Sequence, residues 1–339
     1  MMSFKNKFDL VKRNTTEIIG EDNLVLLLKE KKNPVVYWGT ATTGKPHIGY
    51  FFPMLKIADL LRAGFKVKIL LADLHAALDN VEWSIVDKRY DYYKKAIPEM
   101  VKAIGINPKN LEFIKGSEMQ LKPDYMYDVL KMSSYVSVRD SNKAAAEVVK
   151  MGDNPKLSGL IYPLMQAVDE EYLRVDCQLG GTDQRKIMVL ARENLPKIGY
   201  DRRIEIMHPL IPGLIGKKMS ASDDNSKIDL TDDEETVKRK INKAECIEGD
   251  PNNGLMSFLK YVIMVIKFDN DKTFKIQRAK KYGGNIEYKN YEDIEKDFVE
   301  KKLHPMDLKI ALAREISDLL SKIDVESLNK LAEKAYRNI

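Results

Sequence analysis

The sequence predicts an α/β protein with a doubly wound, mainly parallel sheet and a C-terminal α-helical domain. Two observations carry this prediction. Short apolar runs alternate with helical patterns up to about residue 230, which is typical of successive βαβ units. From about Thr231 onward helical patterns dominate and strand signals fade. We therefore expect a Rossmann-like domain over 1–230 and a helical domain over 231–339.

The elements follow in order along the chain. One or two amphipathic helices are expected over 7–32, and helices of the second domain over 232–245, 254–266, 305–323 and 326–338. Expected strands of the first domain lie at 34–38, 65–76, 111–116, 175–181 and 204–210. Expected helices between them lie at 52–64, 84–104, within 124–150, 157–173 and 182–195. Ligands of such sheets bind beyond the carboxyl ends of the strands, so the chemistry is expected at strand-to-helix turns.

Length and composition exclude several classes of protein. Of 339 residues, 44% are hydrophobic and 32% charged, which indicates a globular chain. No apolar run approaches the roughly 18 to 20 residues of a membrane helix, and the N-terminus lacks the apolar core of a secretion signal, so we expect a cytosolic protein. Cys177 and Cys246 have no Cys/His cluster beside them, which argues against disulfides and structural zinc. A net charge of +5 decides nothing about nucleic acid by itself.

The turn "TTGKPHIGY", residues 42–50, joins the first strand to its helix. Gly39 and Gly44 let the backbone approach a ligand closely, and Pro46 suits the first turn of a helix whose free N–H groups attract an anion. Lys45 and His47 add donors for phosphate oxygens. The turn lacks the GxxxxGK[ST] pattern, and a purely structural turn is the alternative.

A second candidate loop is "GLIGKKMSASDDNSKIDL", residues 213–230, after the last expected strand. Its adjacent Lys217 and Lys218 form a cationic loop able to close on a polyphosphate and to stabilise charge in a transition state. The alternative is a solvated surface loop.

Two further patterns suggest ligands. Tyr162, Gln166 and Asp169 share one face of an expected helix, where the alternative is contact with water. In 267–285, lysines and arginines alternate with aromatic residues, as in surfaces that contact phosphates and stack on unpaired bases; a solvated face is the alternative.

The motifs together resemble a known family. "PHIGY" and "KMSAS" resemble, in order and placement, the His-Ile-Gly-His and Lys-Met-Ser-Lys-Ser signatures of class I aminoacyl-tRNA synthetases. "YWGTATTGKPHIGY", "LLADLHA", "IYPLMQAVDEEYL" and "GGTDQRKI" resemble the archaeal and eukaryotic tyrosyl-tRNA synthetases over nearly the whole chain. The resemblance implies activation of L-tyrosine by ATP with Mg²⁺, held through the ATP phosphates rather than in a metal site of the protein, and transfer to tRNA(Tyr).

The resemblance also implies roles for individual residues. Tyr37 and Asp169 would hold the substrate phenol hydroxyl, and Tyr162, Gln166 and Gln184 would surround its α-amino group. The pocket wall would add Gly39, Leu70, Ala72 and His75. ATP would contact Gly44, His47, Tyr50, Lys217, Lys218, Met219, Ser220 and Ser222, with His47 and Lys218 catalytic. In the tail, Tyr282 would stack on the first anticodon base and Asp307 would accept its hydrogen bonds.

Two positions depart from the family pattern. Tyr50 replaces the second histidine of the first signature, and Ala221 replaces the second lysine of the second, which shifts the expected charge stabilisation onto Lys218 with help from Lys217 or the metal ion. Family members are homodimers, and the insertion at about 84–154 resembles the segment that pairs across the two-fold axis.

Three alternatives remain at this point. A tryptophanyl enzyme would share the fold and the second loop, but it would not need the hydroxyl contacts of Tyr37 and Asp169. A non-catalytic RNA-binding protein could keep the scaffold. A small nucleotidyltransferase would share the histidine turn but would have no use for the helical tail.

Overall fold

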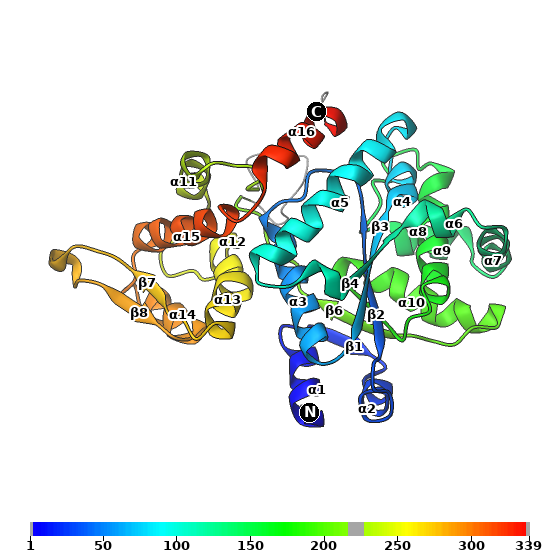
Figure 1. Cartoon of the computed structure of the whole chain (residues 1–339), viewed down its shortest axis with the longest axis horizontal. Helices are drawn as coiled ribbons and strands as arrows, with labels where there is room; N and C mark the ends of the chain where they lie inside the picture. Colours follow the sequence, from blue (N-terminus) through cyan, green and yellow to red (C-terminus); the bar gives the residue numbers. More distant parts are fainter. Residues whose placement is uncertain (1–2, 216–226, 337–339) are drawn as a thin grey trace.

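The computed structural model describes residues 3–215 and 227–336 and has a six-stranded sheet at its centre (Figure 1). The strand order is β1-β6-β5-β2-β3-β4; β1 is antiparallel to β6 and every other neighbouring pair is parallel. The strands are β1 Glu17–Ile19, β2 Val35–Ala41, β3 Lys66–Ala72, β4 Leu111–Lys115, β5 Cys177–Gly181 and β6 Ile204–His208. The predicted doubly wound, mainly parallel sheet is confirmed.

The strand order reverses between β2 and β5. The chain runs from β2 outward through β3 to β4, and then returns to place β5 on the other side of β2, followed by β6. A reversal of this kind opens a crevice at the carboxyl ends of the two neighbouring strands, where doubly wound folds bind ligands. The first turn, 42–50, begins at that edge of β2.

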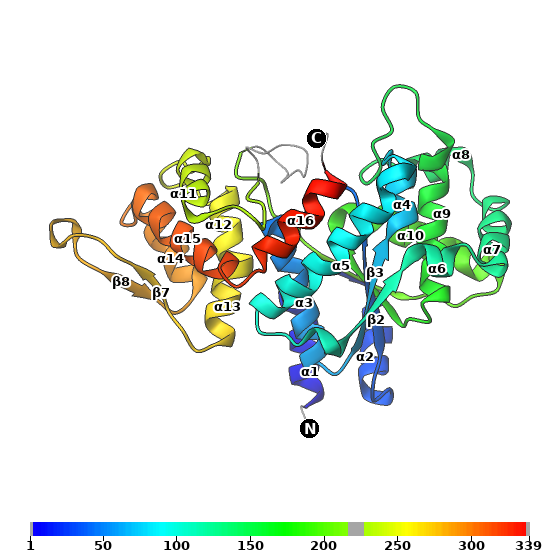
Figure 2. The same ribbon diagram turned by 45° about the horizontal axis from the view of Figure 1, so that its top comes forward.

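Helices cover both faces of the sheet (Figures 1 and 2). The N-terminal part contains α1 Phe4–Lys12, α2 Glu21–Glu30, α3 Phe51–Arg62, α4 Asp73–Leu78, α5 Val86–Ala103, α6 Gly116–Gln120, α7 Pro123–Ser133, α8 Val138–Ala145, α9 Leu157–Tyr172 and α10 Arg185–Asn194. Side chains alternate along β2, so that Val36 and Trp38 pack with α3 and α5 while Tyr37 faces the cluster of α7, α9 and α10. Tyr37 is therefore presented on the face opposite to the main core.

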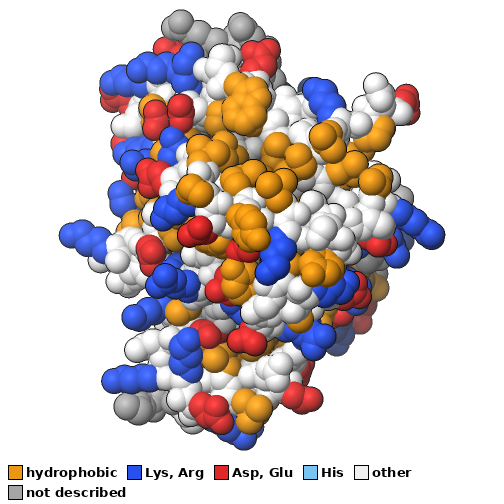
Figure 3. Space-filling view, turned by 90° about the vertical axis from the view of Figure 1, so that its right-hand side faces the viewer, with side chains coloured by type: hydrophobic (Ala, Val, Ile, Leu, Met, Phe, Trp, Pro, Cys, Tyr) orange, Lys and Arg blue, Asp and Glu red, His pale blue; other side chains and the backbone are white. Residues whose placement is uncertain are grey.

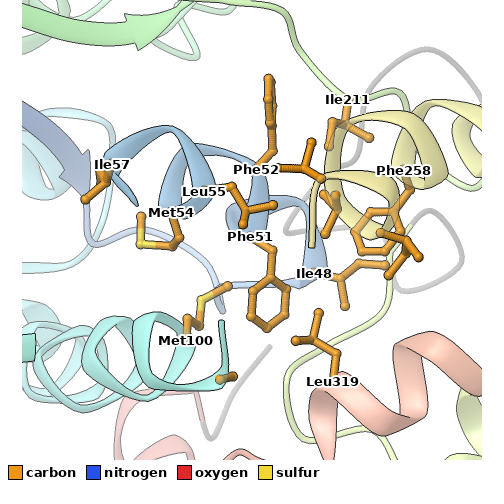
Figure 4. Close-up of a cluster of buried hydrophobic side chains, with 14 of the residues drawn as sticks. Ile48, Phe51, Phe52, Met54, Leu55, Ile57, Met100, Ile211, Phe258 and Leu319 are labelled. Carbon is orange, nitrogen blue, oxygen red and sulfur yellow. The ribbon is translucent and has the colours of Figure 1, made fainter. Parts of the chain in front are cut away.

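The main core continues into the C-terminal part. Figure 4 shows side chains of α3, such as Phe51, and of the turn before it, such as Ile48. They lie together with Met100 of α5, Phe258 of α12 and Leu319 of α15. The C-terminal elements are α11 Glu234–Lys243, α12 Gly254–Phe258, a π-helical stretch Leu259–Ile263, α13 Met264–Asp269, β7 Phe274–Ile276, β8 Ile286–Tyr288, α14 Tyr291–Val299, α15 Pro305–Leu320 and α16 Val325–Ala335. In Figures 1 and 2, α16 lies back along α5, far from the hairpin β7–β8. We propose that the boundary between the two predicted domains lies near residue 230.

Several local expectations were wrong. The segment 7–32 contains a strand, β1, between its two helices, and the hairpin β7–β8 lies in the part where helices were expected to dominate and no strand was predicted. The strand expected over 65–76 ends at Ala72, because Asp73 begins α4. The helix after the first turn begins not at Pro46 but at Ile48, as a 3₁₀ turn Ile48–Tyr50 that leads into α3. No helix of the described residues is long and apolar enough to cross a membrane.

Candidate functional site

A cavity of about 570 Å³ lies at the carboxyl ends of the central strands. Its size falls within the usual range of small-molecule sites, about 300 to 1,000 Å³. The residues expected to bind tyrosine all line this cavity: Tyr37, Gly39, Leu70, Ala72, His75, Tyr162, Gln166, Asp169 and Gln184. So do three residues expected to bind ATP, namely Gly44, His47 and Tyr50. The fold therefore brings together residues that lie up to about 150 positions apart in the sequence, although their individual roles stay predictions.

Asp169 provides a buried carboxylate at the cavity wall. Its side chain is 1% exposed, and its Oδ1 accepts hydrogen bonds of 2.8 Å from Gln120 Nε2 and from the Tyr125 hydroxyl. Burial raises the pKa of Asp169 to about 7, against the lowering effect of these two donors. His75 Nε2 lies 3.9 Å from Oδ2, and burial lowers the pKa of His75 to about 4, so it stands there as a neutral ring. Oδ2 is therefore the oxygen left to accept from a ligand.

Tyr37 and Gln178 have polar atoms with no partner among the residues that the structure describes. They lie opposite each other on β2 and β5, and the unpartnered atoms are the Tyr37 hydroxyl and Gln178 Oε1. An unsatisfied buried polar group costs about 1–3 kcal/mol, so two of them in one cavity wall indicate a site that a polar ligand completes. Burial, with the nearby carboxylates Glu170 and Asp169, raises the pKa of Tyr37, which keeps its hydroxyl protonated.

Two glutamines meet on the other side of the cavity. Gln166 Nε2 donates to Gln184 Oε1 at 2.9 Å. Gln166 belongs to α9, and Gln184 ends the 3₁₀ turn Thr182–Gln184 after β5. Tyr162, one turn before Gln166 on α9, is buried and packs edge-on against His75. In the predicted stripe of α9, Tyr162 and Asp169 are thus buried and Gln166 is half-buried, and amide oxygens are available for a cationic amine.

His47 is held as a neutral hydrogen-bond donor. Its Nδ1 accepts from Gly49 N at 3.2 Å, which leaves the ring proton on Nε2. Burial, and the charge of Lys227, lower the pKa of His47 to about 3. The neighbouring Tyr50 hydroxyl lies 3.4 Å from both Thr40 Oγ1 and the Tyr93 hydroxyl. The first turn therefore offers uncharged donors rather than an imidazolium.

The second loop returns to the first turn. Ile48 N donates to Ile228 O at 3.0 Å, and His47 forms a β-bridge with Asp229. Lys227, which is 2% exposed, pairs with Asp229 at 2.8 Å. The predicted contacts Lys217, Lys218, Met219, Ser220 and Ser222 lie outside the described residues, as does Ala221. The end of the loop is nevertheless fixed beside His47.

The two predicted anticodon contacts lie away from the cavity. Tyr282 is 62% exposed in the loop between β7 and β8, and Asp307 is in the first turn of α15. Arg278 joins these places: Nε donates to Gly284 O at 2.9 Å, and Nη1 lies 3.8 Å from Asp307 Oδ2. Gly283, with φ of 97°, adopts the left-handed conformation at this loop.

Sequence reasoning missed Gln120, Tyr125 and Gln178. Gln178 carried a usable signal, because it is a polar residue within the otherwise apolar end of an expected buried strand. Gln120 and Tyr125 carried none, since they reach Asp169 from helices more than 40 positions earlier in the chain. Among the residues described, no cluster of three or more His, Cys, Asp or Glu side chains could hold a metal.

The chain is similar to known proteins over almost its whole length. Residues 29–321 match the family described as tRNA synthetases class I (W and Y). The chain is 48% identical to the cytoplasmic tyrosine–tRNA ligase of Gallus gallus over 98% of its own length, and it spans 64% of the length of that relative. It is also 48% identical to the cytoplasmic tyrosine–tRNA ligase of Saccharomyces cerevisiae, covering 97% of this chain and 87% of that protein.

A solved structure agrees with these relatives. Tyrosyl-tRNA synthetase from Archaeoglobus fulgidus, solved in complex with L-tyrosine, matches 97% of this chain and 99% of its own, with a TM-score of 0.88 and 36% identity. The names of the relatives agree with the cytosolic location expected from the sequence. The chain belongs to the class I tRNA synthetases, and within them to the tyrosyl-tRNA synthetases of the archaeal and eukaryotic type.

Proposed function

We propose that this protein is a tyrosine–tRNA ligase, which forms tyrosyl-adenylate from L-tyrosine and ATP and then transfers tyrosine to tRNA(Tyr). One observation carries the choice of amino acid. The cavity contains the Tyr37 hydroxyl, unpartnered among the described residues, and the buried carboxylate of Asp169 with Oδ2 free to accept. A phenol hydroxyl can donate to the carboxylate and accept from Tyr37, which satisfies both groups.

Phenylalanine would leave both groups buried and unpaired. Tyrosyl enzymes are known to reject phenylalanine about 10⁵-fold on this ground, without an editing site. The indole of tryptophan has an N–H donor but no acceptor for the Tyr37 hydroxyl, and it is a larger ring system. This argument favours the tyrosyl over the tryptophanyl reading.

Activation requires positioning and charge stabilisation. The tyrosine carboxylate attacks the α-phosphorus of ATP in line and displaces pyrophosphate. ATP enters as its Mg²⁺ complex, so the metal is part of the substrate. His47, whose Nδ1 accepts from Gly49 N, would donate to phosphate oxygens from Nε2–H, and Lys218 of the second loop would supply positive charge. In the second step a terminal ribose hydroxyl of the tRNA attacks the mixed anhydride and releases AMP.

The chain also presents a surface suited to a second copy of itself. Figure 3 shows hydrophobic side chains gathered on the face where α6 to α8 lie. The exposed apolar residues of this segment are Leu121, Met126, Tyr127, Leu130, Tyr135 and Val138. Because α7 also buries Tyr125, Val129 and Met132 on its inner side, it is apolar on both faces, as expected of a helix covered by a partner. We propose a homodimer across this face.

Amino-acid-dependent ATP–pyrophosphate exchange tests the activity. We expect exchange with tyrosine, none with phenylalanine and none with tryptophan. Exchange with tryptophan alone would assign the tryptophanyl reaction instead. Binding of tRNA(Tyr) without exchange with any amino acid would identify an RNA-binding protein that has lost catalysis, and tyrosine-dependent exchange without charging of tRNA would favour a nucleotidyltransferase.

A further inference from the structure

We propose that the C-terminal helix α16 positions the first phosphate turn, with Tyr336 and Tyr93 as positioning residues for ATP. This inference rests on the proposed function and adds a role for residues at the far end of the chain. The Tyr336 hydroxyl donates to Gly44 O at 3.1 Å, across 292 positions of sequence. The Tyr93 hydroxyl of α5 donates to the same oxygen at 2.7 Å. Both lone pairs of one carbonyl in the turn are thus engaged.

Arg89 extends the contact to the preceding peptide. It donates to Thr43 O from Nη1 and to Ala335 O from Nε, so one guanidinium joins the turn to the end of α16. The guanidinium also lies 5.0 Å from the centre of the Tyr336 ring, and Lys45 Nζ lies 5.8 Å from it. Tyr92 packs edge-on against the same ring at 5.3 Å. Tyr336 is therefore 8% exposed and held from several sides.

The geometry of the peptide bond explains what these contacts achieve. In a trans peptide, the C=O of one residue and the N–H of the next point in opposite directions. Holding Thr43 O and Gly44 O on the side of α5 and α16 therefore directs the N–H groups of Gly44 and Lys45 the other way. No hydrogen bond within the described residues uses either N–H group. Gly44 lines the cavity, whereas Lys45 is not among the described residues that do, so the Gly44 N–H is the amide oriented as a donor for an anionic group within it.

Tyr93 and Tyr336 act from behind the turn. Neither is among the described residues that line the cavity, whereas the turn that they hold is. A direct contact with ATP is not needed for them to affect its binding. Removal of one donor leaves the carbonyl of Gly44 held by a single hydrogen bond and should weaken the binding of phosphate, while the tyrosine pocket on the other face of β2 keeps its shape.

The test compares hydroxyl deletions. Tyr336→Phe and Tyr93→Phe are assayed by tyrosine-dependent ATP–pyrophosphate exchange, with separate KM values for ATP and tyrosine. We expect the KM for ATP to rise about 3- to 10-fold in each variant, the usual effect of losing one neutral hydrogen bond. The KM for tyrosine should stay within about twofold. Tyr288→Phe is the matched control, because this buried tyrosine of the same C-terminal part donates to Asp297 Oδ2 at 2.9 Å.

Two results would overturn the proposal. One is an ATP KM for Tyr336→Phe and Tyr93→Phe no higher than that of Tyr288→Phe. The other is a parallel rise of both KM values with a lowered melting temperature, which would show a general loosening of the fold. Binding of the Mg²⁺ complex of α,β-methylene-ATP, measured by calorimetry without tyrosine, separates this inference from the proposed function. If the wild type shows no tyrosine-dependent exchange, the proposed function fails, while weaker analogue binding by the two variants would still support the positioning role.

Discussion

At the scale of single residues, stability and the proposed function make opposing demands on Asp169. It is buried almost completely, and burial raises its pKa to about 7 from the usual 3.8. Between these two values the folded protein binds more protons than the unfolded chain, so this residue makes stability fall as the pH rises from about 4 to 7. The proposed function nevertheless needs its carboxylate as an acceptor. A charge kept at a cost to stability indicates a functional position.

Asp169→Asn separates the two requirements. The asparagine Oδ1 can keep the bonds from Gln120 and Tyr125, so folding should survive, and the free energy of unfolding at pH 8 should not fall. The KM for tyrosine in the exchange assay should rise at least about tenfold, or 1.4 kcal/mol, because an amide donor replaces an acceptor facing the phenol.

Asp128→Asn provides the control for this substitution. Asp128 is also buried and accepts from two tyrosine hydroxyls, those of Tyr172 and Tyr200, but it does not line the cavity in the described structure. The KM of Asp128→Asn for tyrosine should stay unchanged. An unchanged KM in Asp169→Asn as well would show that this carboxylate does not contact the substrate.

The predictability of the site also differs from residue to residue. Tyr162, Gln166 and Asp169 could be grouped from the sequence because a helix repeats every 3.6 residues, and α9 does place them on one cavity wall. Gln120 and Tyr125 belong to other helices, so no local period connects them with Asp169. Resemblance to a family added Tyr37. That its hydroxyl has no partner among the described residues is visible only in the structure.

At the scale of elements, local signals and tertiary pairing compete. The strands of the parallel sheet were predictable because each contains a short apolar run of strand length that alternates with helical patterns along the chain. β1 was not, since Glu17–Ile19 is only three residues long and is a strand because β6 offers it a free edge. The start of α4 could not be predicted from the sequence. In "LLADLHA" apolar residues lie on both sides of the point where β3 ends and α4 begins, so the pattern does not change there.

Helix α7 gives the prediction at this scale. Leu130, 66% exposed, lies at the centre of its outer face, and a buried charge there would cost more than a dimer of moderate size gains. Leu130→Glu should convert a dimer to a monomer in sedimentation velocity at micromolar concentration, with an unchanged melting transition of the monomer fold. Leu26→Glu on α2, where Leu26 is 52% exposed, should remain dimeric. A wild type that sediments as a monomer would refute the proposed interface.

At the scale of the whole molecule, the C-terminal part cannot be treated as an appendage. Side chains of α12 and α15 share a core with α3 (Figure 4). The Tyr336 hydroxyl, directly after α16, donates a hydrogen bond to Gly44 O of the first turn. Deleting everything beyond residue 231 would therefore damage activation as well as any contact with tRNA. The sequence could not show this, because the return of α16 to α5 depends on tertiary packing. A test of tRNA recognition consequently needs point substitutions.

Asp307 is the position at which a point substitution tests tRNA recognition most directly. A carboxylate on a surface that meets RNA is repelled by phosphates, so its favourable use is to accept hydrogen bonds from a base edge. Asp307→Asn replaces one acceptor oxygen by a donor and should lower kcat/KM for tRNA(Tyr) by about 10- to 100-fold, since one base contact contributes about 1–3 kcal/mol. Tyr282→Ala should have an effect of similar size, through the loss of stacking. Tyrosine-dependent exchange should stay unchanged in both variants, because the cavity lies elsewhere.

Glu292→Gln is the control, because Glu292 is an exposed acid of α14 in the same part of the chain. This substitution should change neither the charging of tRNA(Tyr) nor the exchange. If Asp307→Asn charged tRNA(Tyr) as well as Glu292→Gln does, the loop held by Arg278 would not read the anticodon.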